Sequence, residues 1–333
     1  ERLEPGSELR QRAKLRAEIF EQSRRLGHRD LQADKGVLEK LLERAEKEGW
    51  TDYQAIAHHL LGRHTRHIGR AEQAEFHYRE AEAKIDAQAR PTEAFKISTG
   101  VGNLLLTRGR IEPARRALRR ALEIADREGF RSYRPMATAD LGYLEMVAGR
   151  LDRAREIMSE ALELTREAGA RTLEPRIYNL FGEVCRERGE IEKAREAYQQ
   201  ALKKYAGTEM RRAILPMLNL GLLAALNGRL QQAEGYFWGV SEEADRRKHE
   251  MYRAASALGL AYCAAEAGRW SEADERLREA RLELADHETV TVDFAKLAEE
   301  LGESAQSSGR PRLARQAFEI ALNQRRQLDH EKR

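Results

Sequence analysis

Four histidines lie close together in the segment HHLLGRHTRH. They are His58, His59, His64 and His67. Imidazole binds Zn²⁺ and titrates near neutral pH, so such a group has the chemistry of a metal site or of a pH-responsive site. His64 and His67 are three residues apart and can share one face of a helix. The segment has no HExxH spacing, no nearby cysteine and no carboxylate at ligand spacing. We therefore expect a polar surface here and no bound metal.

The sequence offers no other grouping of catalytic side chains. Cys185 and Cys263 have no histidine or aspartate arranged around them, and two cysteines are too few for a disulfide framework or a four-ligand zinc site. We interpret both as small apolar packing groups. No Gly-rich phosphate loop, nucleophile elbow or pair of catalytic carboxylates occurs. We therefore expect a protein that is not an enzyme and that carries no cofactor.

The composition excludes several classes of partner. Charged residues make up 35% of the 333 residues, more than the roughly 25% of an average domain, which is typical of long solvent-exposed helices. The 59 basic and 56 acidic residues nearly cancel, so no net field favours nucleic acid. No apolar run approaches the ~20 residues of a membrane span. We expect no direct contact with nucleic acid or membrane, and a reducing, cytoplasmic location.

A repeat of about 40 residues organises the elements that position these side chains. Glycines recur at spacings of 39 to 41 residues, and six of the seven are followed by arginine: Gly69, Gly109, Gly149, Gly189, Gly228, Gly268 and Gly309. An alanine follows each glycine by five residues: Ala74, Ala114, Ala154, Ala194, Ala233, Ala273 and Ala314. A small residue precedes each by seven: Gly62, Gly102, Gly142, Gly182, Gly221, Ala261 and Gly302.

Each repeat is predicted to be a helix hairpin. In residues 135–168, apolar residues recur at three- and four-residue steps up to Val147, which indicates an amphipathic helix. Gly149 can adopt the left-handed conformation that ends this helix, and Asp152 places a negative charge in the first turn of the next. The small residue and the alanine mark close approaches of the two backbones, where a larger side chain would overpack. A hairpin cannot bury its apolar face alone, so the hairpins must stack.

This spacing resembles the tetratricopeptide repeat. The segment YNLFGEVCRERGEIEKAREAYQQAL (178–202) places Phe181, Gly182, Gly189, Ala194 and Tyr198 on the positions of that motif. The usual unit has 34 residues, and the longer unit here is similar to those of kinesin-light-chain-like proteins and of bacterial signal-transduction regulators. The resemblance implies an all-α fold, a right-handed α-solenoid of helix hairpins. We expect residues 1–50 to form a degenerate N-terminal repeat or cap. Residues 51–333 would continue it as seven repeats with a polar C-terminal cap.

The resemblance also implies that partners bind in a concave groove lined by the first helix of each hairpin. The predicted groove residues are His59, Arg63, Arg66, Lys96, Asn103, Tyr143, Met146, Asn179, Glu183, Arg186, Leu218, Asn219, Leu222, Tyr262, Glu299 and Glu303. They run from basic through apolar and aromatic to acidic, which suits a peptide or helix with the complementary order. Alternatively, Met146 and Leu222 belong to the core between repeats.

The basic end of this row carries two interpretations. Arg63, Arg66, Lys96 and Asn103 have side chains that suit a peptide carboxylate or a phosphate. Chaperone-binding members of the family use a Lys/Asn clamp for a carboxylate, but its full pattern is not reproduced here. A solvated basic face is the other interpretation.

These observations predict an interaction domain that binds a protein or peptide and belongs to a larger bacterial regulatory protein. The alternative is a ligand-gated module that senses a small molecule or short peptide and switches an attached ATPase, kinase or DNA-binding effector. Thermal stabilisation by a small ligand would distinguish the two hypotheses.

Overall fold

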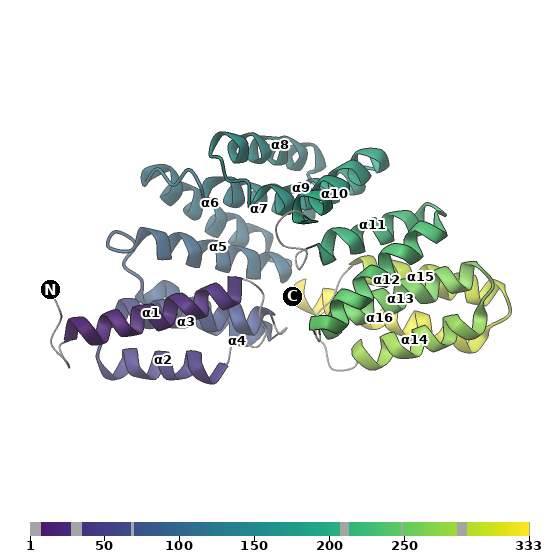
Figure 1. The fold of residues 1–333 in the computed structure, drawn as a ribbon, viewed down its shortest axis with the longest axis horizontal. Coiled ribbons are helices and arrows are strands. Elements are labelled where there is room, and N and C mark those ends of the chain that lie inside the picture. The colour runs from purple at the N-terminus through teal and green to yellow at the C-terminus, as the bar shows by residue number, and fades with distance from the viewer. Residues whose placement is uncertain are drawn as a thin grey trace. The chain divides into compact units, whose positions relative to one another are not determined.

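The structure, a computed structural model, describes residues 8–27, 35–67, 70–206, 213–247, 249–284 and 292–332. These residues form α-helices joined by short turns, and no β-strand occurs among them (Figure 1). The contacts divide the chain into two compact units, residues 1–140 and residues 141–333. Each unit is described by itself.

The first unit holds six complete helices and the start of a seventh. They are α1 (Glu8–Gly27), α2 (Lys35–Lys47), α3 (Thr51–His67), α4 (Ala71–Lys84), α5 (Pro91–Thr107), α6 (Ile111–Arg127) and, across the boundary, α7 (Arg134–Val147). The second unit continues with α8 (Leu151–Glu167), α9 (Glu174–Glu187), α10 (Ile191–Ala206), α11 (Ile214–Leu226), α12 (Leu230–Arg247), α13 (Glu250–Glu266), α14 (Trp270–Leu284), α15 (Val292–Ser307) and α16 (Pro311–Lys332). From α3 onward, each odd-numbered helix pairs with the helix that follows it as a hairpin.

The repeated glycines end the first helices as the sequence predicts. Gly149 has φ 76°, and the N–H groups of Gly149 and Arg150 donate to the carbonyls of Met146 and Glu145, both at 2.9 Å. A residue with a Cβ would be destabilised by about 1–2 kcal/mol in this left-handed conformation. The other repeated turn glycines also have positive φ, between 65° and 74°: Gly109, Gly189, Gly228, Gly268 and Gly309. Gly69 lies outside the described residues.

The small residues of the first helices sit against large side chains of the second. A Cβ added to Gly182 in α9 would lie 2.6 Å from the ring of Tyr198 in α10, closer than carbon atoms pack. The same close contacts, at 2.5–3.2 Å from an added Cβ, occur for Gly62, Gly102, Gly142, Gly221 and Gly302 with Tyr78, Leu118, Met158, Phe237 and Phe318, respectively. The predicted close approach of the two backbones is confirmed.

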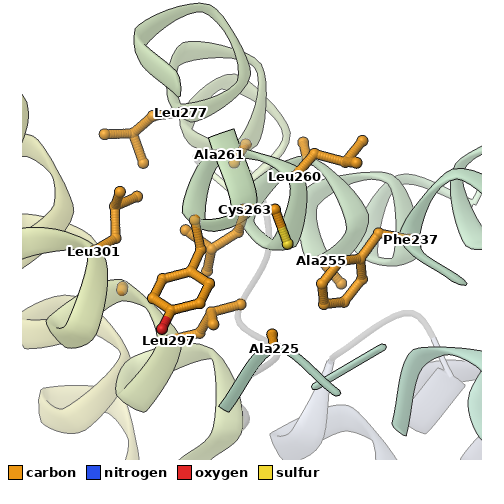
Figure 2. Close-up of a cluster of buried hydrophobic side chains, with 14 of the residues drawn as sticks. Ala225, Phe237, Ala255, Leu260, Ala261, Cys263, Leu277, Leu297 and Leu301 are labelled. Atoms are coloured by element: carbon orange, nitrogen blue, oxygen red, sulfur yellow. The ribbon is translucent and has the colours of Figure 1, made fainter. Parts of the chain in front are cut away.

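The core of each unit runs between the hairpins. The alanines of the second helices are at most 4% exposed, from Ala74 and Ala114 through Ala154, Ala194, Ala233 and Ala273 to Ala314. In the second unit, Phe237 of α12, Cys263 of α13 and Leu297 of α15 belong to one buried cluster (Figure 2). Both cysteines are fully buried, and burial raises the pKa of the Cys185 thiol to about 11 and that of Cys263 to about 12. Their interpretation as packing groups agrees with this environment.

Candidate functional site

A hydrogen-bonded group of three polar side chains links two first helices in the second unit. The amide of Asn179 in α9 donates to Glu183 Oε1 at 2.8 Å. The amide of Asn219 in α11 donates to Asn179 Oδ1 at 3.1 Å and to Glu183 Oε1 at 3.3 Å. Both asparagines are buried, whereas Glu183 is partly exposed. The contacts hold the two amides, and Oε1 of Glu183 accepts from both.

The same repeat positions are paired in the first unit. The amide of Asn103 in α5 donates to Asp140 Oδ2 at 3.0 Å. Asn103 and Glu183 each follow the small glycine of a first helix by one residue, and Asp140 and Asn219 each precede the next such glycine by two. One residue position therefore reaches to the neighbouring first helix in both units. We call the residue that follows the small residue the inner position.

The inner position carries a different chemistry in each repeat. Its occupants are Arg63, Asn103, Tyr143, Glu183, Leu222, Tyr262 and Glu303, all named in the predicted row. Glu303 is exposed, and Arg63, Asn103, Tyr143 and Glu183 are partly exposed. Leu222 and Tyr262 are buried, and burial, with the neighbouring carboxylates of Glu266 and Glu300, raises the pKa of the Tyr262 hydroxyl to about 12.

Some predicted groove residues are packing residues. Leu218 and Leu222 lie in the core of the second unit with exposures of 4% and 2%, so the core interpretation is the one that fits them. Met146 and Arg186 are partly exposed, and Arg186 pairs with Glu187 at 3.2 Å. Glu299 is partly exposed on α15. The predicted basic residues other than Arg186 lie in the first unit and the acidic ones in the second, and one continuous groove remains a prediction.

The expectation of a polar surface at the histidines is wrong. His58, His59 and His64 are 4–6% exposed, because the next helix covers this part of α3. His58 Nδ1 lies 3.1 Å from Nδ1 of His77 in α4, a hydrogen bond that needs one protonated and one bare nitrogen. The side chain of His67 lies outside the described residues. Among the residues that are described, no three metal-ligating side chains come together.

The basic residues of α3 and α5 surround His59. Burial holds the pKa of His59 well below its ordinary value, and the positive charges of Arg63 and Lys96 lower it further. Burial also lowers the pKa of the Arg63 guanidinium. His59 is therefore neutral at pH 7.

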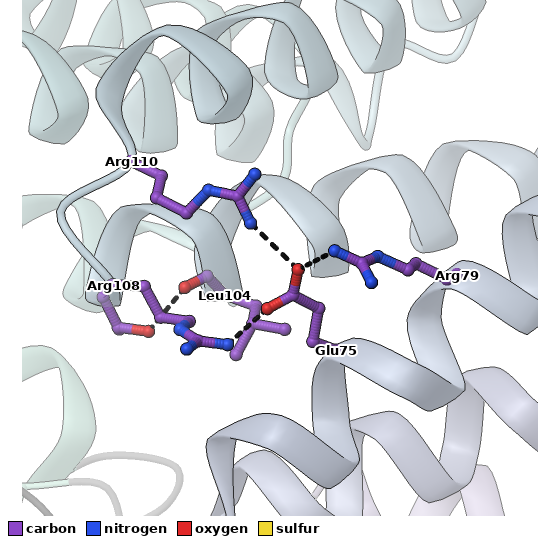
Figure 3. Close-up of polar contacts among 6 residues, drawn as sticks. Glu75, Arg79, Leu104, Arg108 and Arg110 are labelled. Carbon is purple, nitrogen blue, oxygen red and sulfur yellow. Dashed lines mark hydrogen bonds and ion pairs between the residues drawn. The ribbon is translucent and has the colours of Figure 1, made fainter. Parts of the chain in front are cut away.

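At two turns, the arginine after the glycine has a role that the sequence analysis did not assign. Arg110 pairs with Glu75 of the preceding second helix, Nη1 to Oε1, at 2.9 Å, and Glu75 also holds Arg79 and Arg108 (Figure 3). Arg269 pairs with Glu234 at the equivalent positions. The arginine stands one residue and the glutamate six residues after its turn glycine, so the alignment of the repeats contained this signal.

One repeat shows the same contact with the charges exchanged. Glu190 stands where the other repeats have arginine, and it lies 3.6 Å from Arg155, which occupies the position of Glu75 and Glu234. This exchange explains the single exception in the Gly-Arg column. At these three turns, the residue after the glycine therefore forms an ion pair with the second helix of the preceding repeat.

The cavities found are small or open. One of about 70 Å³ lies between α10, α11 and α12, lined by Leu220, Leu223 and Tyr236 among others. Another of about 520 Å³ lies along α15 and α16, lined by Phe318, Ala314 and neighbouring residues. No helix of the described residues combines the length and the apolar character needed to cross a membrane.

Comparison with known proteins connects this geometry to a family of repeats. Two models of the tetratricopeptide repeat match the sequence, one over residues 135–206 and one over residues 179–237. A search of curated proteins finds no match.

Several solved structures share the fold. A Rap protein complexed with Competence and Sporulation Factor is 16% identical, with a TM-score of 0.74 over 99% of this chain and 90% of that one. The Rap conjugation gene regulator of plasmid pLS20, in complex with the Phr* peptide, is 14% identical, with a TM-score of 0.67 over 95% and 96% of the two chains. The apo quorum sensor NprR from B. thuringiensis is 15% identical, with a TM-score of 0.53 over 94% and 99%.

These matches agree with the hairpin geometry, the turn glycines and the close contact between the two helices of each pair. Residues 135–237 match models of the tetratricopeptide repeat, and the fold of the described residues is one of stacked helix hairpins of this type, with a unit of about 40 residues.

Proposed function

We propose that the chain is a non-catalytic recognition domain that binds a peptide or an extended protein segment along its first helices. The observation that carries the proposal is the inner position. This one repeat position carries arginine, asparagine, tyrosine and glutamate side chains that are partly exposed. The side-chain amides of Asn103 and Asn179 on these helices are held by hydrogen bonds. Within each unit, different side chains presented on packed helices suit recognition of a sequence.

The solved structures support a peptide as the ligand. The pLS20 regulator was solved with the Phr* peptide and the Rap protein with Competence and Sporulation Factor, and NprR is a quorum sensor. The resemblance to regulators of this kind supports a sensor or scaffold within a larger bacterial regulatory protein. The ligand-gated module that switches an attached effector is the second form of this proposal, with a short peptide as its ligand.

Selection from a displayed library of random ten-residue peptides tests the proposal on the full chain. We expect a set of related peptides whose dissociation constants rise about tenfold or more when Tyr143→Ala and Glu183→Ala are combined. The matched control is Glu160→Ala with Glu163→Ala, which removes two exposed side chains of the second helix α8. The proposal fails if no related peptides are enriched, or if the first-helix variant binds them as tightly as the control.

A further inference from the structure

The last second helix, α16, has an apolar side that stays open among the described residues. Pro311, Ala314, Phe318 and Leu322 follow one another at i, i+3, i+7 and i+11, so they lie along one side of the helix. We call these four residues the terminal stripe. All four line the open cavity of about 520 Å³ along α15 and α16. Leu322 is 48% exposed, although it belongs to an apolar row.

The repeat itself shows what covers such a row elsewhere in the chain. Phe318 occupies the repeat position of Tyr78 and Phe237, nine residues after the turn glycine. The ring of Phe237 is fully buried. A Cβ added to Gly221 of its own hairpin would lie 2.8 Å from this ring, and one added to Gly259 of the next first helix, α13, would lie 2.6 Å away. Two helices with small residues therefore enclose the ring.

Tyr78 is enclosed in the same way, whereas Phe318 is not. A Cβ at Gly62 of α3 would lie 3.2 Å from the Tyr78 ring, and one at Gly100 of α5 would lie 2.6 Å from it. For Phe318, the contact with its own hairpin is present, because a Cβ at Gly302 of α15 would lie 2.5 Å from the ring. Phe318 is nevertheless only partly buried and lines the open cavity. The missing part is a second helix that offers a small residue.

The terminal stripe and its neighbours are complementary to themselves. Ala314 and Phe318 stand one helical turn apart, so a small and a large side chain alternate along the stripe. Arg315 and Glu319, also one turn apart, line the same cavity and pair at 3.0 Å within one chain. The other charged group near Glu319 is Arg281 of α14, at 3.8 Å. An antiparallel copy of α16 would therefore meet both a size pattern and a charge pattern that match its own.

We infer that two copies of this chain associate through α16, antiparallel about a twofold axis near the middle of the terminal stripe. Each Phe318 then packs over Ala314 of the second copy, which supplies the small residue that glycine supplies inside the chain. Each Arg315 faces Glu319 of the second copy. A contact of this kind is isologous, so it closes at two copies and forms no filament. It uses none of the inner positions and is independent of the proposed peptide binding.

Sedimentation equilibrium of the full chain over a wide range of concentrations tests the inference. We expect a monomer–dimer equilibrium. In F318E the dissociation constant of the dimer should rise about tenfold or more, the loss typical of an aromatic side chain at the centre of an interface. L322E should have an effect in the same direction, and its exposed position leaves the fold of the hairpin intact.

The matched control is L282E, which places the same charge on a side chain of α14 that is 77% exposed and lies outside the terminal stripe. It should associate like the unmodified chain. The charge pattern is tested by reversal: R315E should weaken the dimer, because it places like charges opposite one another, and R315E/E319R should restore it.

Three results would overturn the inference. The first is a chain that remains monomeric at every concentration, and the second is a dimer that F318E and L322E weaken no more than L282E does. The third is a dimer that is no tighter in R315E/E319R than in R315E, which would exclude the antiparallel contact. Circular dichroism of each variant shows whether its helices are intact, so a lost dimer is distinguished from a lost fold.

Discussion

At the scale of single residues, glycine has two different roles in this chain. At the turns it takes a positive φ, and in the first helices it removes a Cβ that would meet a large side chain. Gly182 and Gly235 both lie inside helices of the second unit, but they differ in the space available for a side chain. A Cβ at Gly182 would lie 2.6 Å from Tyr198, whereas one at Gly235 in α12 would meet nothing within 4 Å.

Alanine should therefore have opposite effects at these two positions. We expect Gly182→Ala to lower the free energy of unfolding by about 1–3 kcal/mol through overpacking. We expect Gly235→Ala to raise it by about 0.5–1 kcal/mol, because alanine favours an exposed helix. Urea denaturation followed by circular dichroism measures both. Equal effects of the two substitutions would contradict the close contact.

The pair of His58 and His77 should make the first unit sensitive to acid. Burial, and then the charge of His58, lower the pKa of His77 to about 4 from its ordinary 6.5, and burial also lowers that of His58. The unfolded chain then binds protons first, so stability is intact above pH 6.5 and is lost as the pH falls towards 4. The charged groups facing the pair are Glu46, Glu80, Lys84, Lys35 and Glu39, and the carboxylates weaken the effect.

The measurement compares urea midpoints at pH 7 and pH 5. Between pH 7 and pH 5, the urea concentration at the unfolding midpoint should fall further for the unmodified chain than for the His77→Gln variant. Glutamine cannot become charged at that position. An equal loss in the two proteins would show that other groups cause the acid sensitivity.

At the scale of helices, ion pairs between repeats supplement the apolar contacts. The carboxylate of Glu75 in α4 pairs with three arginines, and its side chain is 14% exposed (Figure 3). Two of these arginines, Arg108 and Arg110, lie at the turn between α5 and α6. A shared, mostly buried carboxylate contributes more than an isolated surface pair, because several charges depend on it.

Removing this charge should therefore loosen the contact of α4 with the α5–α6 hairpin. We expect Glu75→Gln to lower the free energy of unfolding by about 1–3 kcal/mol. Glu123→Gln in α6 is the control, because Glu123 is exposed and has no ion pair among the described residues. If both substitutions change the urea midpoint equally, the three-arginine contact does not stabilise the stack.

The sequence predicted the helix hairpins well because each position is repeated six or seven times. Gly149 and Gly182 were assigned their roles from that repetition alone. It did not predict the burial of His58, since the covering His77 has no counterpart in the other repeats. The pairing of Asn103 with Asp140 was also missed, because it becomes visible only when neighbouring first helices are placed side by side.

At the scale of the whole molecule, the formal charge of +3 says little about binding. Many charges are used in ion pairs within a helix or between helices, whereas Arg63, Arg66 and Lys96 have no ion pair among the described residues. Charges outside such pairs are the ones available to a ligand. The proposed peptide would therefore be recognised by a small fraction of the charged residues.

A bound peptide should stabilise the chain by mass action. At a free concentration one hundred times its dissociation constant, a selected peptide should raise the free energy of unfolding by about 2.7 kcal/mol. Urea denaturation at several peptide concentrations measures the increase. A peptide that binds without raising the stability would have to bind the unfolded chain equally well.

Hydrogen exchange of the full chain, with and without a selected peptide, tests the central claim most directly. Recognition along the first helices predicts slower exchange in α7, α9 and α11 when the peptide is bound. Slower exchange confined to the second helices α8, α10 and α12 would contradict the account.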